Sequence, residues 1–397
     1  MELNEMKIAV IGAGIGGLAV ARALALRGAQ VTVLEQSEAI REVGAGLQIS
    51  PNGAAVLRGL GLDPAGIGQK ARAINLLDHT GRPALRLDLA RQAATRPSDY
   101  YFCHRADLIC ALAESARTAG VRIRLLQKVK EVIPGTPPEI LVCNTARLHP
   151  DLVIGADGLH SCLRNALLGD SRAGFTGQVA WRAVVPLDSA PTPEVRLHMG
   201  PGRHLVTYPL RQGALMNIVA VEERAAWTPD GWSHADDPGN LRRAFAGFPP
   251  EIRQLLARVT ETNLWGLHRH PVAPRWTAGN CALLGDAAHP TLPFMAQGAN
   301  LALEDAWVLA ESLATGLAAG RRPADALRHY EQARVPRIRR AIEAANRNAW
   351  KYHLRFPPLR AVAHTALRLS DRLAPDLMLR QFDWLYGHDV TGGHSLV

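Results

Sequence analysis

A glycine-rich turn near the start of the chain constrains the fold more than any other feature. Residues 7–11 form a short run rich in β-branched residues, and the turn Gly12-Ala13-Gly14-Ile15-Gly16-Gly17 follows it directly. An amphipathic stretch comes next, Gly28 ends it, and residues 31–34 form a second such run before Glu35. This order of strand, glycine turn, helix, strand and acid predicts a βαβ unit with two parallel strands.

Each part of this unit has a separate task at a nucleotide site. Gly12 allows the tight turn, Gly14 lets the backbone approach a pyrophosphate, and Gly17 lets the helix pack close to the sheet. The unpaired amides and the positive end of the helix then face the phosphates. Glu35 is expected to accept hydrogen bonds from a ribose hydroxyl, and we assign its neighbour Gln36 to the same site. The turn alone does not separate FAD from NAD.

Two later segments also place an acid directly after a strand. Asp157 lies in the segment 151–164, after an apolar run and before a helix. Asp286 follows the apolar run 281–284, and its carboxylate suits the ribitol hydroxyls of a flavin. Taken alone, each acid predicts only a turn. Together with the glycine turn, the two acids predict a site for a long dinucleotide, FAD.

The segment 293–300 is predicted to face the reactive ring of that cofactor, with Pro293 at its start. Gly298, Ala299 and Asn300 open a helix, so their amides can stabilise negative charge on a reduced flavin. The Gln297 side chain, just before that helix, is expected to donate to a substrate hydroxyl or carboxylate. The alternative for Gln297 is a loop amide that only satisfies backbone groups.

Residues from about 174 to 270 have a different character. Alternating apolar stretches at 179–185, 195–199, 204–209 and 215–221 predict an antiparallel sheet. The nucleotide-site pattern resumes at 281–284, and helices are expected in the remainder. The predicted fold class is therefore α/β, with a Rossmann-like FAD-binding domain interrupted by an antiparallel-sheet substrate domain and followed by C-terminal helices.

This pattern divides the chain into six expected segments. The FAD-binding domain takes 1–72, 98–173 and 272–340; the substrate domain takes an excursion at 73–97 and the sheet at 174–271; the C-terminal helical segment takes 341–397. Within the first segment a helix is expected to start at Ser50-Pro51, with Ser50 as its cap and Pro51 at its first position.

Several motifs resemble those of the single-component FAD-dependent aromatic hydroxylases, and the resemblance covers nearly the whole chain. Asp157-Gly158 with Ser161 and Arg164 is similar to the Asp-Gly signature of that family, and Gly285-Asp286-Ala287-Ala288-His289-Pro290 is similar to its Gly-Asp signature. The resemblance implies that the Asp157 segment contacts both FAD and NAD(P)H. It also implies that Arg105 lies against the FAD.

Further segments are most similar to the branch with salicylate hydroxylase, 3-hydroxybenzoate 6-hydroxylase and 6-hydroxynicotinate 3-monooxygenase. They are Gly202-Arg203-His204 with Tyr208-Pro209, Phe294-Met295-Ala296-Gln297-Gly298, and Phe382-Asp383-Trp384-Leu385-Tyr386. The resemblance implies a monooxygenase that uses NAD(P)H, with NADH favoured, and O2 to hydroxylate a small phenolic aromatic acid through a C4a-hydroperoxyflavin. The substrate can be salicylate-like or 3-hydroxybenzoate-like. The alternatives are a hydroxylase of an N-heteroaromatic acid such as 6-hydroxynicotinate, or a non-hydroxylating flavoprotein reductase.

A phenol is a stronger ring nucleophile when it is ionised, so a general base is expected beside its hydroxyl. His204 suits this task because the unperturbed pKa of histidine lies near neutral pH. Tyr208, four residues further along a predicted strand, should project from the same face. The resemblance supports His204 and Tyr208 as catalytic and substrate-binding residues. Gln297 is assigned the same two roles. Gln48 is assigned to the substrate site, at a position where some relatives acting on hydroxynicotinate carry a histidine.

Composition and charge exclude other classes of function. The net charge of +9, from 45 basic and 36 acidic residues, favours anionic cosubstrates and substrates or simply a solvated basic surface. The arginine run at 334–347 has the spacing of the exposed side of a helix and no interleaved aromatic residues, so no nucleic-acid partner is expected. The apolar runs are too short to span a bilayer, so no membrane partner is expected.

The remaining expectations concern metals, compartment and assembly. Asp236, Asp237, His268 and His270 lack a recognisable ligand spacing, and the five cysteines lack a Cys-x-x-Cys spacing, so no metal site is expected. The odd cysteine count and the lack of a signal-peptide layout predict a cytoplasmic protein. The expected partners are the aromatic acid, O2 and NAD(P)H, and the expected assembly is a monomer or a homodimer.

Overall fold

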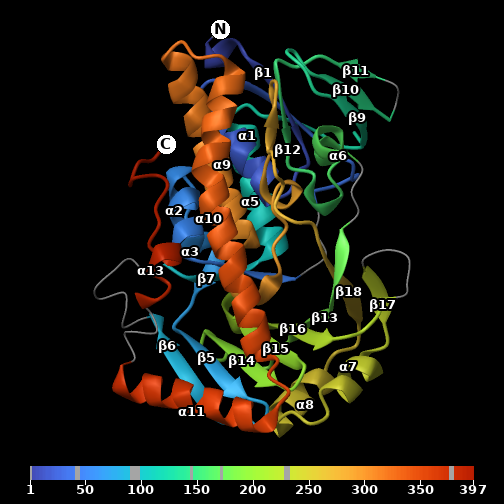
Figure 1. The fold of residues 1–397 in the computed structure, drawn as a ribbon, viewed down its shortest axis with the longest axis vertical. Coiled ribbons are helices and arrows are strands. Elements are labelled where there is room, and N and C mark those ends of the chain that lie inside the picture. The colour runs from blue at the N-terminus through green and yellow to red at the C-terminus, as the bar shows by residue number, and fades with distance from the viewer. Residues whose placement is uncertain are drawn as a thin grey trace.

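Two sheets form the framework of the computed structural model, with helices packed around them (Figure 1). The helix α10 (Pro323–Tyr352) runs from the first half of the molecule, which holds the N-terminus, towards the second (Figure 1). The structure describes residues 2–40, 45–89, 99–143, 146–169, 173–227, 233–374 and 380–397. The junction expected between residues 97 and 98 lies outside the described residues.

The first sheet has six strands in the order β19-β20-β12-β1-β2-β8. The strands from β20 to β8 are all parallel, and β19 is an antiparallel edge. The predicted parallel pair of the βαβ unit is therefore confirmed, because β1 and β2 are neighbours. The bounds of these strands are β1 (Lys7–Ile11), β2 (Gln30–Leu34), β8 (Arg122–Arg124), β12 (Leu152–Gly155), β19 (Thr277–Ala278) and β20 (Cys281–Leu283).

The helix α1 (Ile15–Ala25) packs against α5 (Arg105–Thr118) and α9 (Gly298–Ala318). Its apolar residues are buried because these helices cover the side that faces away from the sheet. The apolar stripe of α9 is also buried, from Ala306 to Leu317. The largest hydrophobic core of the protein lies between these helices and the first sheet.

The second sheet has eight strands in the order β17-β18-β13-β16-β15-β14-β5-β6. Neighbouring strands are antiparallel except for β14 and β5, which are parallel. The predicted antiparallel sheet is therefore confirmed, as is the α/β class. The bounds are β5 (Ala73–Asp78), β6 (Pro83–Asp88), β13 (Gly174–Pro186), β14 (Glu194–Gly200), β15 (Arg203–Leu210), β16 (Leu215–Glu223), β17 (Ser233–Asp236) and β18 (Thr262–Arg269).

The strand register sorts the second sheet into two faces, since successive side chains point to opposite sides. On the outer face, Trp181 and Leu205 pack in one cluster with α7 (Pro238–Ala244) and α8 (Pro250–Ala257). The opposite side is called the inner face here. Its central members, set by the pairs His204–Val221, Tyr208–Asn217 and Arg182–Val219, are Ala180, Arg182, His204, Val206, Tyr208, Asn217, Val219 and Val221.

Smaller elements complete the described chain. Two three-stranded sheets have the orders β3-β7-β4 and β11-β10-β9. Their bounds are β3 (Gly46–Ile49), β4 (Gly68–Lys70), β7 (Tyr101–His104), β9 (Val129–Ile133), β10 (Glu139–Val142) and β11 (Arg147–Leu148). The other helices are α2 (Pro51–Gly59), α3 (Pro64–Ile67), α6 (Cys162–Leu168), α11 (Pro357–Leu373) and α13 (Asp383–Tyr386), with 3-10 turns η1 (Leu3–Glu5), η2 (Gly158–His160), η3 (Arg211–Gly213), η4 (Gly285–Ala287) and η5 (Pro293–Met295). Among the described residues, none of the helices is long and apolar enough to cross a membrane.

Two local predictions differ from the structure. Ser50 stands at the N-cap of α2, as expected, but its side chain does not cap the helix because its hydroxyl bonds Asn52 and Gln297 instead. The arginine run is not wholly exposed, since the Arg334 side chain is only 1% exposed and pairs with acids of α9. In addition, α10 runs unbroken through the segment boundary expected between residues 340 and 341.

Candidate active site

The four predicted nucleotide motifs meet at one edge of the first sheet. Gly12 follows β1, Glu35 follows β2, Asp157 follows β12 and Asp286 follows β20. These four strands are adjacent and parallel, so their carboxyl ends lie side by side. In open α/β sheets this edge is where ligands bind. The fold therefore brings together residues that are more than 270 positions apart in the sequence.

The three motif glycines are required for different reasons. Gly12 has a φ of +99°, and a Cβ there would lie 2.5 Å from the Ala156 oxygen. A Cβ on Gly17 would lie 2.0 Å from the Gly12 oxygen. A Cβ on Gly14, by contrast, would meet no described atom within 4 Å. The described protein itself thus leaves room at Gly14, where a pyrophosphate would approach the backbone.

The Glu35 side chain is hydrogen-bonded to the glycine turn. Its Oε2 accepts a hydrogen bond of 2.8 Å from the Ala13 amide, and its Oε1 accepts one of 2.9 Å from the Ser37 amide. Each carboxylate oxygen has a second lone pair, so the group can still accept from a ribose hydroxyl. The next residue, Gln36, is exposed beside it.

Asp157 and Asp286 can each still accept a hydrogen bond from a ligand, Asp157 through an oxygen without a partner among the described residues and Asp286 because it is exposed. Asp157 Oδ2 accepts from the Cys162 amide at 2.7 Å, whereas its buried Oδ1 has no partner among the described residues. Asp286 is exposed, although enough protein surrounds it that burial raises the pKa of its carboxyl. Burial likewise raises the pKa of Asp157. The positive charge of Arg105, the first residue of α5, opposes the shift at Asp286, so the two side chains lie within electrostatic reach.

The predicted flavin-facing segment ends at the head of the long helix α9. The first hydrogen bond of the helix runs from the Leu301 amide to the Gln297 carbonyl. The amides of Gly298, Ala299 and Asn300 lie before it, in the first turn, where amides have no partner within the helix. The Asn300 side chain is already used, since its Nδ2 donates to the Gln48 carbonyl at 3.0 Å and its Oδ1 accepts from the Ser50 amide. Any contact of Asn300 with the flavin therefore comes from its main chain. Pro293 begins the 3-10 turn η5 in the same segment.

Gln297 is buried in a polar network between α2 and α9. Its Nε2 donates to the Ser50 hydroxyl at 3.0 Å, and its Oε1 accepts from Asn52 at 3.2 Å. Asn52 in turn donates to Glu304 at 2.6 Å. In this arrangement the Gln297 amide holds two helices together. A substrate contact by Gln297 stays a prediction.

His204 and Tyr208 both lie on the inner face of the second sheet, as the spacing predicted. His204 is 3% exposed, and its ring centre lies 5.6 Å from that of Phe294, in the segment predicted to face the flavin. Burial, and to a lesser degree the neighbouring His353, lower the pKa of His204 well below its ordinary value. His204 is therefore neutral at neutral pH, which is the protonation state that a general base needs.

Tyr208 has its own set of neighbours on the inner face. Its side chain lies beside Gly46 and interacts with Gln48, whose Oε1 also accepts a 2.6 Å bond from the Tyr100 hydroxyl. Burial raises the pKa of Tyr208, so its hydroxyl keeps its proton. His204 and Tyr208 are separated by four residues of strand, about 13 Å at the rise of a β-strand. Val206 lies between the two residues on the same face.

Sequence reasoning missed several residues near these two positions. Asn217 pairs with Tyr208 across the sheet, is fully buried, and has an Nδ2 without a partner in the described part of the chain. Arg182 lies on the same face, with its guanidinium 5.5 Å from the centre of the Trp265 ring. Pairing the two strands on either side of the turn at Gly213 would have placed Asn217 opposite Tyr208. His353, which bonds His204 from the end of α10, had no local signal at all.

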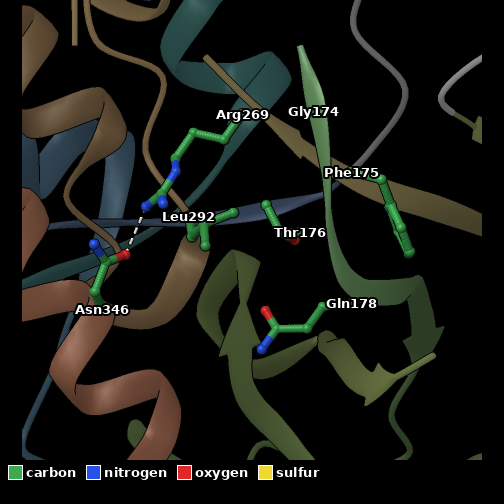
Figure 2. A pocket seen from close by; sticks show the side chains of 7 residues that line it. All are labelled: Gly174, Phe175, Thr176, Gln178, Arg269, Leu292 and Asn346. Carbon is green, nitrogen blue, oxygen red and sulfur yellow. Dashed lines mark hydrogen bonds between the residues drawn. The ribbon is translucent and has the colours of Figure 1, made fainter. Parts of the chain in front are cut away.

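Figure 2 shows a pocket lined by residues of β13, by Arg269 of β18 and by Asn346 of α10. Its volume is about 340 Å³. Arg269 reaches across it to Asn346 of α10, to which it donates a 2.6 Å hydrogen bond. Leu292, directly before the flavin-facing segment, lies on its wall, and Gln178 and Thr176 come from β13. The pocket is thus polar and lies next to the apolar cluster that contains Phe294.

The chain belongs to the FAD binding domain family, whose model matches residues 5–345. It is 36% identical to a 3-amino-4-hydroxybenzoate 2-monooxygenase of Streptomyces platensis, over 98% of this chain and 97% of the relative. It is also 32% identical to 3-hydroxybenzoate 6-hydroxylase 1 of Aquipseudomonas alcaligenes, over 97% and 98% of the two chains. Among solved structures, HpxO of Klebsiella pneumoniae complexed with FAD and uric acid has 28% identity, a TM-score of 0.81, and coverage of 96% of this chain and 97% of that one.

The residues present fit FAD. Gly14 leaves room for the pyrophosphate, the buried Asp157 Oδ1 needs a partner, and the exposed Asp286 offers a carboxylate at the same sheet edge. FAD is therefore the cofactor of this family member, and the predicted family resemblance is confirmed. When bound, FAD supplies electron transfer and the activation of O2, while the protein supplies binding, orientation and shielding.

Proposed function

We propose that this protein hydroxylates a small phenolic aromatic acid, using FAD, O2 and NAD(P)H, with NADH favoured. The relatives named above are, by their names, monooxygenases or hydroxylases of hydroxybenzoates. One observation carries the proposal to this chain. His204, a buried neutral imidazole on the inner face, has one ring nitrogen bonded to His353, and its Nε2 has no partner among the described residues. That nitrogen is available to a phenolic hydroxyl.

We assign a task towards the substrate to the polar residues of the inner face and to Gln48 of β3. His204 takes the proton of the ring hydroxyl, and Tyr208 and Gln48 bind the ring from its other end. Asn217 donates its unpartnered Nδ2 to an acceptor atom of the substrate, which removes the cost of a buried donor without a bond. Arg182 supplies positive charge on the same face for the carboxylate. FAD is held by Gly12, Gly14, Gly17, Glu35, Gln36, Arg105, Asp157, Asp286, Pro293, Gly298, Ala299 and Asn300.

A substrate screen tests this proposal. The holoenzyme is mixed with NADH and 3-amino-4-hydroxybenzoate, 3-hydroxybenzoate, salicylate, 6-hydroxynicotinate or uric acid, and NADH oxidation, H2O2 and product mass are recorded. We expect a phenolic acid to accelerate NADH oxidation and to gain one oxygen atom. If salicylate is the substrate, the product will also have lost CO2. Indifference to every phenolic acid would overturn the proposal, and turnover of only the N-heterocycles would replace it with the alternative.

His204→Ala is expected to keep FAD and to lose hydroxylation by roughly a hundredfold, since a positioned base contributes about that much or more. NADH would still be consumed in part, with H2O2 as the product. The matched control is His198→Ala on β14, a buried histidine that pairs with Leu205 and so belongs to the outer face. The ratio of product to NADH should be normal in that control. An equal loss in both variants would show that His204 matters only for folding.

Gln297→Ala tests the remaining substrate assignment. If Gln297 touches the substrate, the variant will retain FAD but release most of its reducing equivalents as H2O2. If the network with Ser50 and Asn52 is its only task, the variant will instead lose stability and bound FAD together. FAD content by absorbance and the ratio of H2O2 to NADH distinguish the two results.

A further inference from the structure

A chain of hydrogen bonds leads from His204 to the protein surface. His204 Nδ1 lies 2.6 Å from His353 Nε2, and His353 Nδ1 lies 3.0 Å from Glu223 Oε1. The His204 and His353 side chains are almost wholly buried, whereas the Glu223 side chain is 31% exposed. Its other oxygen, Oε2, accepts a bond of 2.9 Å from Nε of the exposed Arg355. The chain of bonds thus spans from the inner face to solvent.

This chain of bonds fixes which ring nitrogens carry protons. The Glu223 carboxylate is only an acceptor, so His353 Nδ1 must be protonated. In the neutral ring His353 Nε2 is then an acceptor, and His204 Nδ1 must donate to it. His204 Nε2 is left as a bare acceptor, which is the form that removes a proton from a substrate.

We propose that His353 and Glu223 are positioning residues that hold His204 in its basic tautomer and relay the substrate proton between His204 and solvent. This inference rests on the proposed function. When a phenolic O–H bond breaks, His204 Nε2 gains that proton and Nδ1 passes its own proton to His353 Nε2. His353 Nδ1 then gives its proton to Glu223, and solvent receives it. When the product phenolate is protonated again, the same transfers run in reverse and restore the starting tautomers, so no oxidant or reductant is consumed.

The groups around the relay keep both rings neutral at rest. Burial lowers the pKa of His353, and the positive charges of Arg355 and Arg203 lower it further, against the opposing effect of Glu223. His204 faces His353 together with the rings of Tyr352 and Phe294. The Phe294 ring also lies 6.3 Å from His353, so the flavin-facing segment covers both histidines. These contacts exclude water from the middle of the chain, which leaves the imidazoles as the path for the proton.

His353→Gln separates relay from structure. A glutamine can accept from His204 and donate to Glu223, so it keeps both hydrogen bonds but cannot pass a proton between them. We expect FAD content and substrate Kd to be unchanged and kcat at neutral pH to fall about tenfold, which is less than the hundredfold or more that loss of a positioned base costs. The loss should shrink as the pH rises towards about 10, where a phenol ionises by itself. Absorbance of the bound aromatic acid should show its phenol pKa raised in the variant.

Glu223→Gln should behave in the same way, because the amide oxygen still accepts from His353 but cannot take up the proton. The matched control is Glu222→Gln, one residue earlier on β16, whose carboxylate pairs with Arg203 and Arg224 outside the relay. That control should keep the wild-type pH profile. The relay is wrong if the wild type hydroxylates a phenolic acid and His353→Gln has an unaltered pH profile. If the wild type hydroxylates no phenolic acid, the proposed function itself has failed.

Discussion

The Gly14→Val protein is expected to fold normally and to purify without FAD. In the structure a Cβ at this position meets no described atom within 4 Å, and the φ of −74° is one that any residue adopts. The isopropyl group would instead occupy the space through which the pyrophosphate approaches the helix end. We expect FAD affinity to fall by at least about a thousandfold, which is roughly 4 kcal/mol of binding free energy. Flavin absorbance and titration of the apoprotein with FAD measure this loss.

The glycine at position 17 provides the contrast. Its Cβ would lie 2.0 Å from the Gly12 oxygen, so Gly17→Val must push α1 away from the turn. We expect this variant to lose several kcal/mol of folding free energy, of the order found for overpacked cores. The Gly14→Val apoprotein should unfold within about 0.5 kcal/mol of the wild-type apoprotein. A Gly14→Val protein that carries a full complement of FAD would contradict the placement of the phosphates.

Replacement of Arg334 by methionine should destabilise the fold by about 3–5 kcal/mol, because it removes the buried cation shared by two buried acids. Among the described residues, Glu304 then keeps only Arg337 as a cationic partner, and Asp305 keeps only His289. Arg334 donates to Glu304 at 2.8 Å and to Asp305 at 2.7 Å, and both acids are fully buried. Asp305 also accepts from the Gly285 amide at 3.2 Å, next to Asp286. The loss of Arg334 should therefore weaken FAD binding as well. Urea unfolding of the holoenzyme and of the apoprotein measures the two effects separately.

The stability lost in Arg334→Met should depend on pH. Burial alone would raise the pKa values of Glu304 and Asp305, but the nearby cations, Arg334 among them, bring both below their ordinary values. Carboxyls with lowered pKa stabilise the fold above about pH 4 and lose that contribution as the pH falls through the folded-state value. The Arg334→Met deficit should therefore be largest near neutral pH and smaller in acid. Arg339→Met, at an exposed position of the same helix, is the control and should change the free energy of unfolding by less than about 0.5 kcal/mol. Equal stability of the two variants would show that the buried ion pairs of Arg334 do not stabilise the fold.

The nucleotide half of the site could be predicted because its signals are local. Each motif residue lies within three positions of the end of its own strand, and the carboxyl ends of parallel strands must share an edge. Once the strands are recognised, Gly12, Glu35, Asp157 and Asp286 are placed together by topology alone. The shared face of His204 and Tyr208 follows in the same way from the two-residue period of a strand.

The parts that could not be predicted depend on contacts between distant segments. Gln297 bonds Ser50, which is 247 positions away, and His204 bonds His353, which is 149 positions away. No local pattern indicates such partners. The burial of Arg334 has a similar origin, because helical spacing groups residues on a face but does not say which face another helix will cover. Here α9 covers the side with Arg334 and supplies the acids that make its burial tolerable.

We propose that this chain places one atom of O2 on the ring of a phenolic acid. The most direct measurement is turnover of the holoenzyme with NADH and isotopically labelled O2, followed by mass spectrometry of the aromatic product. We expect the product to gain one labelled oxygen atom and His204→Ala to abolish most of this incorporation. Oxygen derived from water instead, or NADH oxidation that yields only H2O2 with every phenolic acid, would contradict it.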